Sequence, residues 1–233
     1  MTKSSKWSDI VIMLLSLVVI GGSILWMLWS TKLFDLNQDT RLSWHLIRAT
    51  AISGYLLVAG STIWGLFVSS QLVKNWSPGI ISMSMHSAMS WLGLLLGLVH
   101  ALLLLTDKFF TYTLADIFVP FTGPYRPEAV GLGTLAFWVI LLVSISFWFK
   151  KQMGHRAWKW LHLTSYIAFA MLTLHAIFAG TDGQLLGLRL VMGTAVMTVI
   201  TLLIMRVRRD QTSKKPAPAE RPARMARGQA NGG

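Results

Sequence analysis

The sequence predicts an all-α integral membrane protein: a bundle of six transmembrane helices with both termini in the cytoplasm and a disordered basic C-terminal tail. Of its 233 residues, 54% are hydrophobic and only 13% are charged, whereas a soluble domain has about 25% charged residues. Six long apolar runs divide the chain, and the basic residues behind its net charge of +12 lie between and after them. Membrane topology explains this placement, so we expect the lipid bilayer as a partner and no nucleic acid.

Each of the six apolar runs is long enough to cross a bilayer, which takes about 20 helical residues. They cover residues 10–29, 49–73, 80–105, 129–149, 160–179 and 185–207. The first is too long for a signal peptide and lacks a small-residue cleavage site, so we expect it to be retained. The predicted segments are an N-terminal part with the first helix and an outer loop (1–43), a core (44–183), the last helix (184–209) and a tail rich in Pro, Ala, Gly and Arg (210–233).

The longest predicted loop, "DKFFTYTLADIFVPFTGPYRPE", joins the third and fourth runs. Its first part predicts a short interfacial helix, and Pro127 suits the first turn of the next span. The membrane side of that short helix would carry Phe109, Phe110, Leu114, Ile117 and Phe118.

The positive-inside rule gives the orientation of the bundle. With the N-terminus in the cytoplasm, the inner segments carry fifteen Lys and Arg residues and the outer loops five, leaving out Arg189 within the last run. We therefore expect both termini inside, in the cell membrane.

Four histidines lie inside the third and fifth runs, where ionisable groups are costly and tend to mark function. Both runs cross from inside to outside, so depths can be compared directly. His86 and His162 lie just past the inner edge, and His100 and His175 near the outer end. The sequence thus predicts one pair in each leaflet, with the two layers roughly 20 Å apart at about 1.5 Å per residue.

The third run also places its histidines on one face. The fourteen residues from His86 to His100, at about 100° each, return to within about 40° of the start. Gly93 and Gly97 share that face and would admit a bulky flat group, although small residues also let helices pack closely in lipid. The thirteen residues from His162 to His175 leave these about 140° apart. Either a local distortion such as a π-bulge corrects this, or the two side chains approach from different directions.

Two separated histidine pairs restrict the ligand chemistry. The chain has no cysteine, and a structural zinc site needs four clustered ligands. Heme needs only two, because the porphyrin supplies four nitrogens and the protein two axial imidazoles. Two hemes, one in each leaflet, would carry electrons across the membrane.

Longer motifs around the histidines are specific: "RATAISGYLLV", "HALLLLTD", "VPFTGPYRP", "GLGTLAFWVILLVSISF" and "WKWLHLTSYIAFAMLTLHAIFAGTD". With the histidine spacings, residues 44–183 resemble the ferric reductase-like transmembrane domain of NADPH oxidases and ferric reductases, in its bacterial single-domain branch. The resemblance implies heme b ligation by His86 with His162 near the cytoplasm, and by His100 with His175 near the outside. The flavin and nicotinamide domain of the larger relatives is missing, so the resemblance implies electrons from quinol, a separate flavoprotein or a bound flavin. Some single-domain relatives resemble the heme subunit of the periplasmic methionine-sulfoxide reductase system.

Heme propionates need cationic neighbours. Arg156 would serve at the inner level, and Arg48 and Arg126 at the outer level. The predicted function is diheme electron transfer from a cytoplasmic-side or membrane donor to an outer acceptor, either ferric iron or a partner reductase. The chain would be a ferric reductase-like oxidoreductase or the electron-transfer subunit of one. A proton-coupled transporter and a structural subunit without heme are the alternatives.

Overall fold

The computed structural model describes residues 40–70, 78–180, 182 and 185–213, and this part of the chain is helical with no strand. Its helices are α2 (Thr40–Ser69), α3 (Gly79–Leu103), α4 (Leu114–Phe118), α5 (Pro127–Ser146), α6 (Lys150–Met153), α7 (His155–Phe178) and α8 (Leu186–Ser213), with a 3-10 turn, η2 (Leu104–Thr106), after α3. Within the described residues, five helices are long and apolar enough to cross a membrane: α2, α3, α5, α7 and α8. The predicted first span (10–29) and the tail beyond residue 213 lie outside the described residues.

Two helices begin earlier than the apolar runs predict. Helix α2 starts at Thr40 instead of residue 49, because its polar first turns continue the helix where hydropathy has already fallen. Arg48 therefore lies within a helix and not in a loop. Helix α7 starts at His155 instead of residue 160, directly after Gly154, whose φ of 79° suits glycine and separates α7 from the unpredicted α6. Helix α8 continues to Ser213, past the predicted start of the tail at residue 210.

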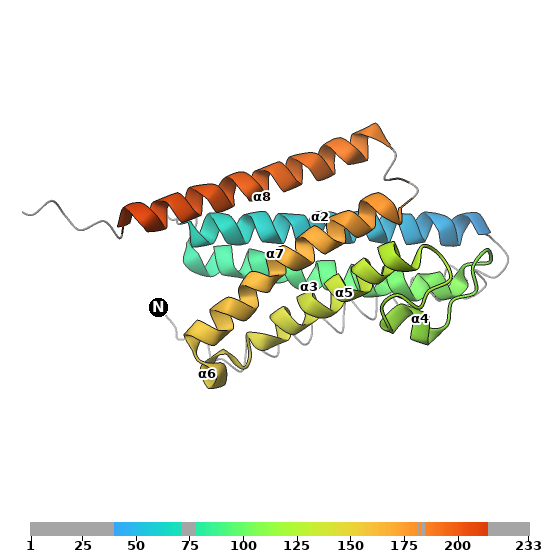
Figure 1. The fold of residues 1–233 in the computed structure, drawn as a ribbon, viewed down its shortest axis with the longest axis horizontal. Helices are drawn as coiled ribbons and strands as arrows, with labels where there is room; N and C mark the ends of the chain where they lie inside the picture. Colours follow the sequence, from blue (N-terminus) through green and yellow to red (C-terminus); the bar gives the residue numbers. More distant parts are fainter. Residues whose placement is uncertain (1–39, 71–77, 181, 183–184, 214–233) are drawn as a thin grey trace, which may run out of the picture.

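The helices pack in neighbouring pairs (Figure 1). Helices α2 and α3 lie side by side, α5 and α7 cross them obliquely, and α8 runs along α2. A buried cluster joins α2, α7 and α8, and it consists of Tyr55, Ala59, Leu66, Phe169, Met192, Val199 and Leu202. Large apolar side chains such as Ile80, Ile167 and Leu190 remain exposed on the outside of the bundle, as expected of surfaces that face lipid.

The connection between η2 and α5 has its own local order. Thr113 and Asp116 form a capping box at the start of α4, in which the Asp116 amide donates to the Thr113 hydroxyl oxygen and the Asp116 carboxylate accepts from the Thr113 amide. Pro127 is the first residue of α5, as its sequence position predicts. The interfacial helix is shorter than expected: Phe109, which is 84% exposed, precedes it, and Ile117 is buried against the protein.

Candidate functional site

Four imidazoles from α3 and α7 meet in two pairs at opposite ends of the bundle. The ring centres of His86 and His162 are 6.0 Å apart with an interplanar angle of 68°. The ring centres of His100 and His175 are 6.3 Å apart with an angle of 71°. These are the pairs that the depth comparison predicts. We call the two ends of the bundle the His86 end and the His100 end.

Three of the four rings are held through Nδ1 by a backbone carbonyl of a neighbouring helix. The Nδ1–oxygen distance is 2.9 Å each time: from His86 to Ser61, from His100 to Ile47, and from His175 to Ala129. Such a bond fixes the ring orientation and the tautomer, and it directs Nε2 to another partner.

His86 has a further polar neighbourhood. The Ser61 hydroxyl oxygen lies 3.0 Å from His86 Nδ1 and 2.6 Å from the Ser90 hydroxyl oxygen, and Ser90 donates to the His86 carbonyl. In an apolar bundle these serines supply most of the polar contacts around the ring. His86 is therefore oriented by side chains as well as by the Ser61 backbone.

The spacing within each pair suits a metal ion between two imidazoles. A metal–nitrogen bond to histidine measures about 2.0–2.1 Å and the ring centre lies about 1.1 Å behind the nitrogen, so a linear arrangement places the ring centres about 6.2–6.4 Å apart. The observed separations are 6.0 and 6.3 Å. In the part of the chain that the structure describes, no group of three or more His, Cys, Asp or Glu side chains gathers at one point. Two protein ligands at each level fit a planar group that brings its own equatorial ligands.

Glycines allow two of the rings to approach a helix backbone. A Cβ at Gly133 of α5 would lie 2.6 Å from Nδ1 of His175, and one at Gly65 of α2 would lie 3.0 Å from Cε1 of His86. Hydropathy and spacing did not single out either glycine. The roles of Gly133 and Gly65 follow only from the packing of α5 against α7 and of α2 against α3.

The two glycines predicted from α3 differ from each other. A Cβ at Gly97 would meet nothing within 4 Å, which leaves open space of the kind that a flat group needs. At Gly93 a Cβ would lie 2.9 Å from Cγ2 of Val58, so this glycine lets α2 and α3 pack closely. For Gly93 the helix-packing interpretation is the one that the contacts favour.

The thirteen-residue interval on α7 is accommodated without a bulge. Helix α7 is a continuous α-helix from His155 to Phe178, so His162 and His175 leave it in different directions. Helix α7 runs obliquely to α3 (Figure 1), and side chains that leave α7 in two directions both reach imidazoles of α3. Of the two alternatives that the sequence left open, the described geometry is the approach from different directions.

His162 has a setting of its own at the His86 end. Its ring stacks on Trp158, with centres 5.0 Å apart and an angle of 21°, and Lys150 Nζ lies 4.1 Å from the centre of the Trp158 ring. Lys150 and Arg206 both act electrostatically on His162, and Arg206 donates to the Tyr166 hydroxyl at 3.2 Å. Sequence reasoning missed these contacts. The Trp158–His162 stack was within reach of the helix spacing, because the two residues lie about one turn apart on α7, whereas Arg206 reaches the site only through the packing of α8.

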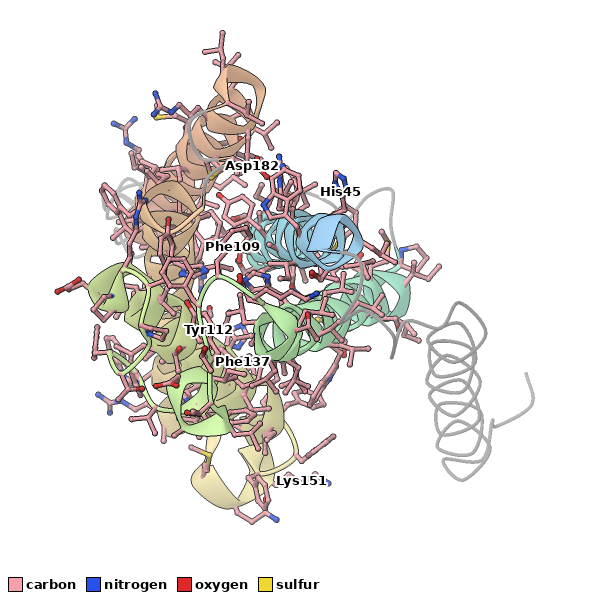
Figure 2. All side chains as sticks on the ribbon, turned by 90° about the vertical axis from the view of Figure 1, so that its right-hand side faces the viewer. His45, Phe109, Tyr112, Phe137, Lys151 and Asp182 are labelled. Atoms are coloured by element: carbon pink, nitrogen blue, oxygen red, sulfur yellow. The ribbon has the colours of Figure 1, made fainter. Side chains whose placement is uncertain are left out.

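The three arginines predicted from the sequence lie in different places. Arg156 is exposed in the first turn of α7. Arg48 forms a bidentate ion pair with Asp182, and Arg126 donates to the Phe178 carbonyl. Figure 2 looks onto the His100 end and shows Asp182 beside the start of α2. Arg48 is therefore partly buried in its ion pair, while Arg126 is exposed and hydrogen-bonded through its guanidinium.

Comparison with protein-family models, with curated proteins and with solved structures gives no match to this chain.

Proposed function

We propose that the protein is a membrane electron-transfer protein that holds two b-type hemes, one between His86 and His162 and the other between His100 and His175. One observation carries the proposal: two separate imidazole pairs face each other across 6.0 and 6.3 Å, the separation expected around a metal ion. When bound, heme iron with two imidazole ligands exchanges single electrons and has no open position for a substrate.

The chain's own residues would set the properties of each site. The carbonyls of Ser61, Ile47 and Ala129 hold Nδ1–H of three ligands, which increases the basicity of the imidazoles and fixes their planes. Gly97 leaves space between the layers. These features support ligation by rigid, pre-oriented side chains.

Cations near His162 suit the anionic edge of a heme at the His86 end. Lys150 and Arg206 act electrostatically on His162, whereas Arg156 is exposed in the first turn of α7. We therefore assign the role of propionate partner at this end to Lys150 and Arg206 in addition to Arg156.

The direction of electron flow follows from the charge distribution. The His86 end carries the basic residues Lys150, Lys151, Arg156 and Lys159, so the positive-inside rule places it in the cytoplasm. Electrons would enter there from quinol or a flavoprotein in the cell membrane or at its inner face. They would leave at the His100 end for ferric iron or a partner reductase, in keeping with the ferric reductase-like resemblance.

The test is the heme content and difference spectrum of purified protein made with excess heme. We expect a b-type reduced-minus-oxidised spectrum and two hemes per chain. His86→Ala and His162→Ala should lose one and the same heme, and His100→Ala and His175→Ala the other, whereas His45→Ala, outside both pairs, should keep both.

Protein without heme would refute the proposal. Uptake in vesicles that depends on pH would then favour the proton-coupled transporter. If neither heme nor uptake is found, the structural subunit remains.

A further inference from the structure

Two arginines at the His100 end bind the chain just after His175. Arg48 of α2 donates from Nε and Nη2 to the two carboxylate oxygens of Asp182. Arg126, which precedes the first turn of α5, donates from Nη1 to the carbonyl of Phe178, the last residue of α7. Arg126 thus ties the start of α5 to the last residue of α7, and Arg48 ties α2 to Asp182, which follows α7 in the chain.

The same two helices supply the carbonyls that hold the histidine pair. Ile47, whose carbonyl accepts from His100, directly precedes Arg48 in α2. Ala129, whose carbonyl accepts from His175, lies in the first turn of α5 that Arg126 starts. Each histidine of this pair is therefore held by a helix whose arginine binds either the last residue of α7 or Asp182 beyond it.

Arg48 is held by partly buried contacts, whereas the Arg126 side chain is exposed and its constraint lies in the backbone. The Arg48 guanidinium also lies 3.9 Å from the centre of the Trp44 ring, and the side chains of Arg48 and Asp182 are only 29% and 12% exposed. Removing one member of such a pair leaves a poorly solvated charge, so the pair resists separation. Arg126 has a φ of 39°, a left-handed conformation that a non-glycine residue keeps only when its surroundings hold it there.

The geometry points to Arg48 and Arg126 as positioning residues for the His100–His175 pair. Through the Ile47 and Ala129 carbonyls they set the distance and orientation of the two imidazoles, and this inference rests on the proposed function for what those imidazoles hold. It differs from the propionate contact that the sequence suggested for both arginines. Moving either carbonyl would alter the Nδ1–H bond of one ligand, and with it the reduction potential of one centre only.

The first experiment is a redox titration of heme-loaded protein. Arg48→Gln, Asp182→Asn and Arg126→Gln should each shift one of two midpoint potentials, and the Arg48→Gln/Asp182→Asn double variant should shift it no more than the larger single effect, because both single changes break one pair. Lys151→Gln, which removes an exposed cation of α6 at the opposite end, is the matched control. Unchanged midpoints, or equal shifts of both centres, would overturn the inference.

A second readout needs no heme. The chain has no cysteine. A double variant with Leu42→Cys on α2 and Leu174→Cys on α7, both exposed positions, therefore takes spin labels at these two sites only, and the distance between the labels can be measured. We expect a narrow distance distribution that broadens with Arg48→Gln but not with Lys151→Gln. If the protein lacks heme, the proposed function fails, while the label distances still show whether Arg48 holds α2 in place relative to α7. If the distances broaden but the midpoints of loaded protein stay fixed, the arginines are structural only and the inference fails.

Discussion

At the scale of single residues, the approach of His175 to α5 depends on Gly133. A Cβ there would lie 2.6 Å from the nitrogen that donates to Ala129. Gly133→Ala should force the ring away from its carbonyl, because Nδ1, Cε1 and Cγ of the His175 ring would all lie within 2.8 Å of the new Cβ. We expect the variant to lose the heme of the His100 end, measured by heme quantification and by the difference spectrum.

The control for this change is Gly193→Ala on α8, where a Cβ would meet nothing within 4 Å. It should keep both hemes. Gly65→Ala, with a milder contact of 3.0 Å to His86, should weaken only the other centre. A Gly133→Ala protein with two unaltered hemes would show that His175 does not depend on this contact.

Tyr112 gives a prediction of pH dependence outside the spanning helices. Burial raises the pKa of its hydroxyl to about 12, and Asp107, Tyr125 and Asp116 add to the shift. The folded protein therefore favours the neutral phenol more than the unfolded chain does. The stabilisation is complete below the ordinary pKa of about 10 and is lost as the pH rises through the folded value of about 12.

Thermal unfolding measured from pH 9 to 12 should show this loss. Tyr112→Phe, which cannot ionise, should lose less stability over that range than the parent protein does. Parallel pH profiles for the two proteins would contradict the assignment. Phe109→Ala, at an exposed side chain in the same connection, serves as the control.

At the scale of helices, the α2–α3 contact separates two roles of glycine. Gly93→Ala would bring a Cβ within 2.9 Å of Val58 Cγ2 and 3.2 Å of its backbone nitrogen, and overpacking of this kind costs about 1–3 kcal/mol. Gly97→Ala meets open space. We expect Gly93→Ala to lower thermal stability whether or not heme is bound, and Gly97→Ala to lower heme content with little effect on the stability of the heme-free chain. Equal stability of the two heme-free variants would contradict this division.

The helices themselves were predictable to the extent that hydropathy marks them. The core of each described span coincides with an apolar run, since lipid-facing and protein-facing surfaces are both apolar. The ends of the helices were not predictable from hydropathy, because the start of α2 at Thr40 and of α7 at His155 depends on polar turns beyond the apolar core. The path of α7 was also hidden, because a helix's tilt against its neighbour leaves no signal in its own sequence.

At the scale of the whole molecule, depth along the helices predicted which histidines face each other. That inference needed only helix rise and a shared direction. It could not find Arg206 beside His162, or Asp182 beside Arg48, since these contacts join parts of the chain far apart in sequence. Trp158 was within its reach, because this residue lies about one helical turn before His162 on α7. A charged side chain at the edge of the membrane can reflect either the topology of the protein or a local interaction partner. Only the contacts within the packed bundle distinguish these two explanations.

In the proposed function, the orientation of the bundle determines which histidine pair would receive electrons first. Figure 1 places α6 and the connection that carries α4 at opposite ends. Lys151 of α6 and Phe109 of that connection are both exposed, and the chain has no cysteine to interfere. In intact cells, a membrane-impermeant thiol reagent should label Phe109→Cys, while Lys151→Cys should react only after the membrane is opened.

Labelling of both positions in intact cells would contradict a bundle that spans the membrane between them. The reverse pattern would place the His100 end inside. Electrons would then have to enter beside Arg48 and Asp182, and the basic His86 end would face the outside, against the usual distribution of Lys and Arg.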